Sequence, residues 1–199
     1  MKINENLTWS NHISTIIAKI SSNLGVIRRV ARVLPSKVMY YLYHTLHYTY
    51  IDYCNMDWAF YNSTFLRNIF RSQKNAIRLI SNSLWNPHST PLFYKSCILK
   101  LHDINTFQVA CFMYKFIYSI LPVSFQSFFV LNNEMHNYST RYSNNVHINS
   151  CATQVRTYSI RNYGPKMWNE IPSKIRHSAS LYVLKKKFKL HLLNTYVGC

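Results

Sequence analysis

The sequence predicts a mainly α-helical protein: a helical bundle over residues 1–130, followed by a small, mostly helical unit over 131–199 with one or two short strands. Two observations support this fold class. The 199 residues include only three glycines and six prolines, which leaves little room for hairpins. Apolar residues make up 48% of the chain, and in several long stretches they recur at intervals of three and four, the spacing of one helix face.

The N-terminal part contains three predicted helices. The first covers residues 11–34, where isoleucine and leucine side chains share one face and Pro35 ends the pattern. The second covers 36–50 and is rich in tyrosine, and the short piece 51–61 after it is expected to bury Trp58. The third covers 63–84, and its apolar stripe includes one polar residue, Gln73.

The helix over 63–84 also carries a row of cations at spacings of four, three and four residues. These are Arg67, Arg71, Lys74 and Arg78. At about 100° per residue they lie within about 60° of arc. Like charges on one ridge repel, and this helix has no acid between them, although a solvated face usually has. We therefore expect the ridge to contact phosphate, with an ordinary solvated face as the alternative.

Three further helices are predicted, over 90–97, 103–120 and 180–196. The first is indicated by Thr90 as N-cap and Pro91 in the first turn, and the other two by apolar residues in helical register. Between the second and third of these lies the segment 131–159, which is polar and rich in Asn, Ser and Thr. We expect a loop there, with one or two short strands, marking the boundary between the two units.

A short element around Trp168 is predicted between two chain breaks. Gly164 and Pro165 form a turn signal, and Pro172 breaks the chain again, so residues 166–171 can make little more than one helical turn. We expect Trp168 to be a buried anchor and Gly164 to supply a backbone bend that other residues could not make.

The charge balance points to a polyanionic partner. Lys and Arg number 23 against six acids, which gives a formal net charge of +17. An excess of this size costs self-repulsion unless an anionic partner shares the surface. Nucleic acid, an acidic membrane face and an acidic protein are the candidates, and the 16 tyrosines and four tryptophans favour nucleic acid because aromatic rings stack on bases. The alternative is biased codon usage, rich in Asn, Ile, Lys and Tyr.

The sequence gives no sign of a catalytic site, a cofactor or a metal. The six acids are scattered, and the nearest pair, Asp52 and Asp57, would lie on different helix faces. There is no glycine-rich phosphate loop, and the nine histidines form no HxxxH or HExxH motif. We therefore expect no enzymatic activity from the chain.

Cysteine usage and hydropathy predict an intracellular protein, nuclear or cytoplasmic, that is neither secreted nor membrane-spanning. The five cysteines form no CxxC pair, which favours reduced thiols. The first twelve residues lack the apolar core of a signal peptide. The most apolar run, 104–121, is interrupted by Asn105, Gln108 and Lys115 and predicts a buried helix.

Several stretches together resemble the C-terminal end of the reverse transcriptase of non-LTR (LINE-type, jockey- and CR1-like) retrotransposons. The tail stretches are 140-TR-141, 159-SIRNYGPKMWNEIP-172 and 181-LYVLKKKFKLHL-192. The stretch 7-LTWSNHI-13 resembles the segment after the palm, and 50-YIDYCNMDW-58, 71-RSQKNAIRLI-80 and 90-TPLFYKSCIL-99 resemble thumb and post-thumb helices. The resemblance covers nearly the whole chain.

This resemblance implies a thumb-like bundle from an RNA-directed DNA polymerase, in which thumb helices hold the template–primer, RNA or an RNA/DNA duplex, by its backbone. The palm aspartates and the endonuclease of that family are absent, so the palm and fingers of a parent polymerase would be its missing partners. The expected nucleic-acid contacts are the ridge Arg67, Arg71, Lys74 and Arg78, then Arg28, Arg29 and Arg32, then Arg141, Arg161 and Lys166. The expected structural motif is Gly164, Pro165, Trp168 and Pro172.

Two alternatives to this role remain open at the level of the sequence. The chain could be a decayed transposon fragment with no independent function. It could also be a helical protein-interaction module that uses its tyrosine-rich surface, because an apolar face left uncovered by a missing palm would look like a partner site.

Overall fold

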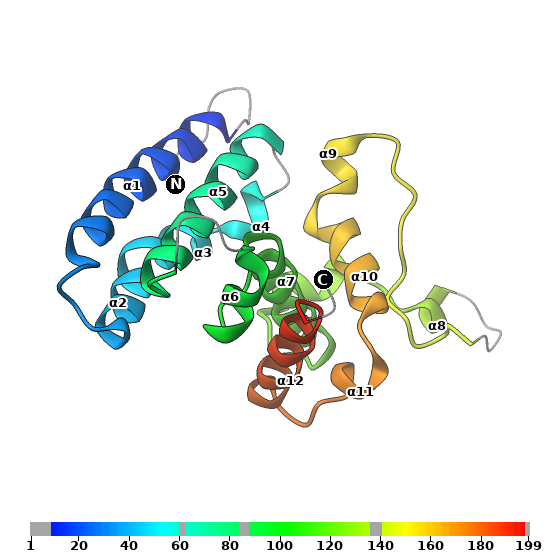
Figure 1. Ribbon diagram of the computed structural model, residues 1–199. Coiled ribbons are helices and arrows are strands. Elements are labelled where there is room, and N and C mark those ends of the chain that lie inside the picture. The colour runs from blue at the N-terminus through cyan, green and yellow to red at the C-terminus, as the bar shows by residue number, and fades with distance from the viewer. Residues whose placement is uncertain (1–8, 60–62, 84–87, 136–140, 198–199) are drawn as a thin grey trace. The chain divides into compact units, whose positions relative to one another are not determined.

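The protein is mainly helical, as the sequence predicts, in a computed structural model that describes residues 9–59, 63–83, 88–135 and 141–197 (Figure 1). The chain forms two compact units, Met1–Asn105 with His191–Cys199, and Thr106–Leu190. The expected division between residues 130 and 131 falls inside the second unit. The reason is that helix α7 (Leu101–Ile117) continues from the first unit into the second, and α12 (Leu181–Asn194) returns to the first.

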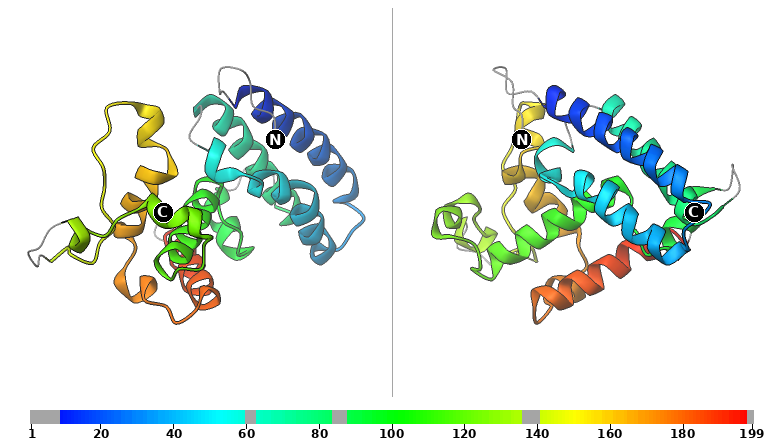
Figure 2. Two further views of the ribbon diagram at one scale, coloured as in Figure 1. Left: turned by 180° about the vertical axis from the view of Figure 1, so that it is seen from behind. Right: turned by 90° about the vertical axis from the view of Figure 1, so that its left-hand side faces the viewer.

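The first unit is built around three helices that lie side by side: α1 (Ser10–Val30), α2 (Ser36–Tyr43) and α5 (Ser63–Ile80) (Figures 1 and 2). After α2 the chain continues through a π-helical turn, η1 (His44–Tyr48), and the short helix α3 (Thr49–Asp52). The helix predicted over 36–50 is thus confirmed, with a π segment inside it. Helices α4 (Asn55–Trp58) and α6 (Ser89–Lys95) complete the unit, and α6 packs on α5.

The core of the first unit forms where the helical spacing predicts it. Ile13, Ile16, Ile20 and Ile27 of α1 are buried, and α5 buries Ile69, Ala76, Ile77 and Ile80. Trp58 is also fully buried, and its indole nitrogen donates a hydrogen bond of 2.9 Å to the carbonyl of Tyr53. The expectation that Trp58 is buried is therefore confirmed.

Gln73, the single polar member of the α5 stripe, is fully buried and fully bonded. Its amide nitrogen donates to the Tyr43 hydroxyl at 3.1 Å and to the Leu99 carbonyl at 3.0 Å. Its amide oxygen accepts from the backbone nitrogen of Leu101 at 2.9 Å. These three bonds satisfy the buried amide of Gln73 and tie α2, α5 and the start of α7 together.

The C-terminal segment is fastened to the first unit by Tyr196. Its hydroxyl donates a hydrogen bond to the carboxylate of Asp103 and accepts one of 3.0 Å from the backbone nitrogen of Lys100. The Lys100 ammonium lies 4.2 Å from the centroid of the Tyr196 ring. These contacts explain why His191–Cys199 belongs to the first unit although it is remote in sequence.

The second unit contains η2 (Val123–Phe128, a 3-10 helix), α8 (Asn132–Met135), α9 (Gln154–Thr157), α10 (Ile160–Glu170) and α11 (Ser173–Arg176), besides most of α7 and α12. In place of the one or two strands expected over 131–159, the described residues of this stretch form one isolated antiparallel bridge, Leu131 to Val146. The Asn169 side chain accepts from the Val146 nitrogen at 3.2 Å and donates to its carbonyl at 2.9 Å. This side chain takes the place of a neighbouring strand.

The chain break predicted at Gly164 and Pro165 is wrong, because α10 runs through both residues. The proline restriction on its preceding residue acts partly through that residue's Cβ, and glycine has none, so the helical conformation stays accessible. Gly164 does not have a positive φ, and the predicted backbone bend is therefore also wrong. The glycine bears instead on packing: a Cβ at this position would lie 2.8 Å from the sulfur of Met113, so a larger residue would need the Met113 side chain to move.

The other two members of the motif behave as expected. Trp168 is buried, with 4% of its surface exposed. Pro172 follows the last residues of α10 and stands at the N-cap of α11, so the predicted break at this position is confirmed. The motif is thus a helix of eleven residues that buries Gly164, Pro165, Met167 and Trp168 and ends before Pro172.

Candidate nucleic-acid interface

A basic groove of about 810 Å³ lies in the first unit, at the C-terminal ends of α1 and α5. Its lining residues are Arg28, Ala31, Arg32, Arg71, Lys74, Asn75, Arg78, Leu79, Asn82 and Ser83. Five of these described residues are cationic and none is acidic, so the groove concentrates positive charge that no carboxylate in its lining offsets. A lining of this kind attracts polyanions.

The packing of α1 against α5 creates this groove. The two helices run side by side in the same direction (Figure 2), so their C-terminal ends meet. Ile27 of α1 and Ile77 of α5 are fully buried, and each is followed directly by an arginine, Arg28 or Arg78. Because side chains next to a buried position lie at the edge of the helix interface, the packing places both guanidinium groups at the rim of the groove.

The α5 side of the groove contributes three of the four ridge cations. Arg71 is exposed, and Lys74 and Arg78 are half-buried. The Lys74 ammonium lies 4.8 Å from the centroid of the Phe70 ring, which holds the charge without neutralising it. Arg78 donates from Nη1 to the Asn75 amide oxygen at 3.3 Å, while its Nε is buried and makes no hydrogen bond with any described residue.

Arg28 and Arg32 supply the α1 side, and both are exposed. Two predicted residues of the first unit do not line the groove. Arg67, one turn before Arg71, is exposed outside it, and Arg29 is exposed with its Nε donating to the Gly25 carbonyl at 3.4 Å. The structure thus brings the ridge and the α1 arginines, which were predicted separately, together into one surface, but without Arg67 and Arg29.

Sequence reasoning missed the neutral donors of the groove, Asn75, Asn82 and Ser83. The turn that places the last two is a helix C-cap: Asn82 has a φ of 44°, and the Ser83 nitrogen donates to the Arg78 carbonyl at 3.1 Å. Asparagine tolerates this left-handed conformation better than most residues do. The dipeptide Asn82-Ser83 directly after the periodic residues of α5 was the signal that could have predicted the cap.

Helix C-termini attract cations in any protein, because the last carbonyl groups carry partial negative charge. This effect accounts for Arg28 and Arg29 in the last turn of α1 and for Arg78 in the last turn of α5. It falls off within one turn, and Arg71 and Lys74 lie six or more residues before Ile80, so it does not account for them. The presence of these two cations in the groove therefore needs another explanation.

The three tail candidates belong to the second unit. Arg161 lines a separate cavity there, whereas Arg141 and Lys166 are exposed and line neither that cavity nor the groove. Within the described ranges, no three His, Cys, Asp or Glu side chains gather in a way that would hold a metal ion. Among the helices that the structure describes, none has the length and apolar character needed to cross a membrane.

Comparison with known proteins adds no relative. The chain is matched by no protein-family model, by no curated protein and by no solved structure. The function proposed below therefore rests on the groove and on the sequence motifs.

Proposed function

We propose that this protein binds a template–primer duplex, RNA or RNA/DNA, through its phosphate backbone, in the manner of the thumb of a non-LTR retrotransposon reverse transcriptase. The observation that carries the proposal is the groove itself, where four cations of α1 and α5 converge with Arg32 of the turn after α1, and its described lining contains no acid. Backbone contacts of this kind position a duplex and carry no sequence information.

The dimensions of the cationic row suit a phosphate backbone. Seven residues separate Arg71 from Arg78, which corresponds to about 10 Å along the helix axis. One strand of double-stranded DNA carries a charge about every 3.4 Å of its axis, and on that scale the row extends over about three phosphates. Arg28 and Arg32 add charge from the opposite side of the groove, and Asn75, Asn82 and Ser83 add neutral groups that can bond phosphate oxygens.

The salt dependence of binding tests this proposal. In one variant the groove cations Arg28, Arg32, Arg71, Lys74 and Arg78 are replaced with Gln, and binding to a short RNA–DNA hybrid is titrated over a range of salt concentrations. Each lost phosphate contact lowers the log–log salt slope by about 0.7 to 0.9, so the variant is expected to flatten the slope by roughly four units. Relative affinities for hybrids of different sequence should stay unchanged.

A matched control carries the same number of charge losses outside the groove. It replaces five exposed lysines outside the groove, Lys37, Lys174, Lys185, Lys186 and Lys187, with Gln. We expect a clearly smaller change of slope, because these residues do not line the groove. Equal flattening by the two variants would mean diffuse attraction by a protein of charge +17, and it would contradict the groove assignment. A cooperative melting transition checks that both variants fold.

A further inference from the structure

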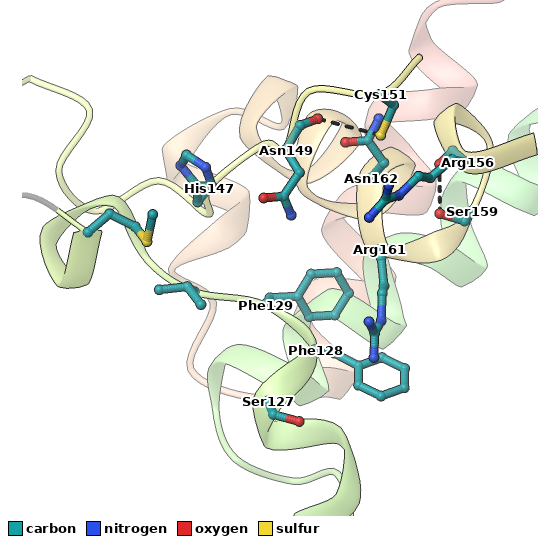
Figure 3. Close-up of a pocket in the computed structure, with 12 residues that line it drawn as sticks. Ser127, Phe128, Phe129, His147, Asn149, Cys151, Arg156, Ser159, Arg161 and Asn162 are labelled. Atoms are coloured by element: carbon teal, nitrogen blue, oxygen red, sulfur yellow. Dashed lines mark hydrogen bonds between the residues drawn. The ribbon is translucent and has the colours of Figure 1, made fainter. Parts of the chain in front are cut away.

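The second unit contains a cavity of about 280 Å³ whose chemistry differs from that of the groove (Figure 3). Its lining combines aromatic rings, cations and amide groups, and no acid is among these described residues. The members used below are Phe128, Phe129, Asn149, Arg156, Arg161 and Asn162. In Figure 3 the rings of Phe128 and Phe129 lie on one side of the cavity, and Asn149, Asn162 and Arg156 lie on the other.

Arg161 and Phe128 form a stacked pair on the cavity wall. The guanidinium carbon of Arg161 lies 4.3 Å from the centroid of the Phe128 ring. Phe128 is itself held by edge contacts with Phe125 and Phe129, at centroid distances of 5.0 and 6.3 Å. A guanidinium held against a fixed ring is a flat, positively charged surface, and unpaired bases stack on such surfaces in single-stranded nucleic acids.

The polar groups of the cavity supply the remaining contacts that a nucleotide needs. The amide oxygen of Asn162 is buried and makes no hydrogen bond with any described residue, so it is an acceptor without a donor. Asn149 offers a second amide, which can bond the edge of a base. Arg156 lies in α9, three residues before the N-cap of α10, Ser159, and its guanidinium is a partner for phosphate.

We propose that this cavity binds one unpaired nucleotide of a single-stranded nucleic acid. In this arrangement the base stacks on the Arg161–Phe128 pair and its edge bonds Asn162, while its phosphate pairs with Arg156. The volume suits a single nucleotide and leaves no space for a duplex. The site lies in the second unit and does not depend on the groove, so it stands or fails independently of the function proposed for the groove.

The alkylation rate of Cys151 measures whether this cavity is occupied, and it requires no substitution in the protein. It lines the cavity and is partly exposed, and Cys97, exposed in the first unit, is an internal control. A short single-stranded oligonucleotide at about ten times its dissociation constant should slow maleimide alkylation of Cys151 about tenfold. Alkylation of Cys97, followed by peptide mapping in the same sample, should be unchanged. Equal rates for Cys151 with and without the oligonucleotide would overturn the proposal.

Substitutions then assign the contacts. An oligonucleotide that carries one 2-aminopurine should lose fluorescence when its base stacks in the cavity, and Arg156→Gln or Arg161→Gln should weaken this binding about tenfold. Lys174→Gln removes the same charge from an exposed site on α11 outside the cavity and should have little effect. A loss of affinity in Lys174→Gln as large as in the other two variants would contradict a specific site.

Two further controls distinguish a nucleotide site from a plain anion site and from binding through the groove. If inorganic phosphate protects Cys151 as well as the oligonucleotide does at equal concentration, the cavity is an anion site and the base contacts are wrong. The groove variant, with its five cations replaced by Gln, should still show oligonucleotide-dependent protection of Cys151. If it shows none, the single strand binds through the groove and the cavity assignment fails.

Discussion

Two glycines lie inside helices but have opposite surroundings. Gly25, in α1, has open space where a Cβ would project, with no heavy atom within 4 Å. Gly164, in α10, would place its Cβ 2.8 Å from the sulfur of Met113, and Met113 is fully buried. The same substitution at the two sites therefore separates the backbone cost of glycine from its packing role.

We expect Gly25→Ala to raise the free energy of unfolding by about 1 kcal/mol, because alanine loses less backbone freedom on folding. Gly164→Ala gains the same term but forces Met113 to move within a packed core, and we expect a net loss of about 1–3 kcal/mol. Chemical denaturation of both variants measures the difference. Stabilisation by both would show that Met113 can move without penalty and that Gly164 has no packing role.

His47 makes the stability of the protein depend on pH. It is fully buried in η1, its Nε2 is 3.3 Å from the Ser72 hydroxyl, and its Nδ1 makes no hydrogen bond with any described residue. Burial lowers the pKa of His47 from 6.5 to about 4. The unfolded chain therefore binds a proton between these two values that the folded chain does not, and stability falls as pH falls through this window.

The corresponding loss is about 3 kcal/mol between pH 6.5 and pH 4, and it is absent above pH 6.5. Other groups titrate nearby: burial lowers the pKa of His12, which acts in the same direction, and raises the pKa values of Asp57 and Asp103. The variant His47→Gln isolates the contribution of His47, since the other groups remain. Urea denaturation across this window should show a flatter pH profile in the variant, and identical profiles would contradict the assignment.

At the scale of single elements, Trp168 is the principal anchor of α10. Its side chain is 4% exposed, and its neighbours Met167 and Ile171 are buried with it. Trp168→Ala should lower the free energy of unfolding by about 3–5 kcal/mol, because it removes a large apolar surface and leaves a cavity. The matched control is Tyr182→Ala in α12, where the ring is 75% exposed and the expected change is within about 0.5 kcal/mol. Similar melting of the two variants would indicate a surface role for Trp168.

Helix α10 also shows that rules based on neighbouring residues alone can predict the wrong local structure. Pro165 is a helix breaker, and the preceding residue is normally pushed out of the helical region, so a break at this point was the reasonable prediction. The outcome differs because the preceding residue is a glycine and because Met113, some fifty positions earlier, packs against it. The second condition depends on a contact between α7 and α10 that no local pattern contains.

Only part of the groove could be predicted from the sequence, because the rest depends on contacts between helices. The cationic ridge of α5 follows from residue spacing within one helix, and that spacing correctly placed Arg71, Lys74 and Arg78 together. Periodicity within α1 and α5 could not reveal that the two C-terminal ends meet, because this depends on which apolar faces pair. Arg28 and Arg32 were therefore recognised as basic residues but not as neighbours of the ridge.

At the scale of the whole molecule, the formal charge of +17 should oppose folding through self-repulsion. Added salt screens this repulsion, since the Debye length falls from about 30 Å at 0.01 M to about 10 Å at 0.1 M. We therefore expect the melting temperature to rise with NaCl over this range.

Replacing Lys185, Lys186 and Lys187 with Gln tests whether repulsion is the cause. These side chains are exposed on α12, and removing them should raise the melting temperature at low salt, with the gain fading as salt is added. The matched variant with Arg at all three positions keeps the charge and should show no gain that depends on salt. A melting temperature that falls as salt is added would mean that attractive ion pairs outweigh repulsion, and the charge excess would then be no argument for a polyanionic partner.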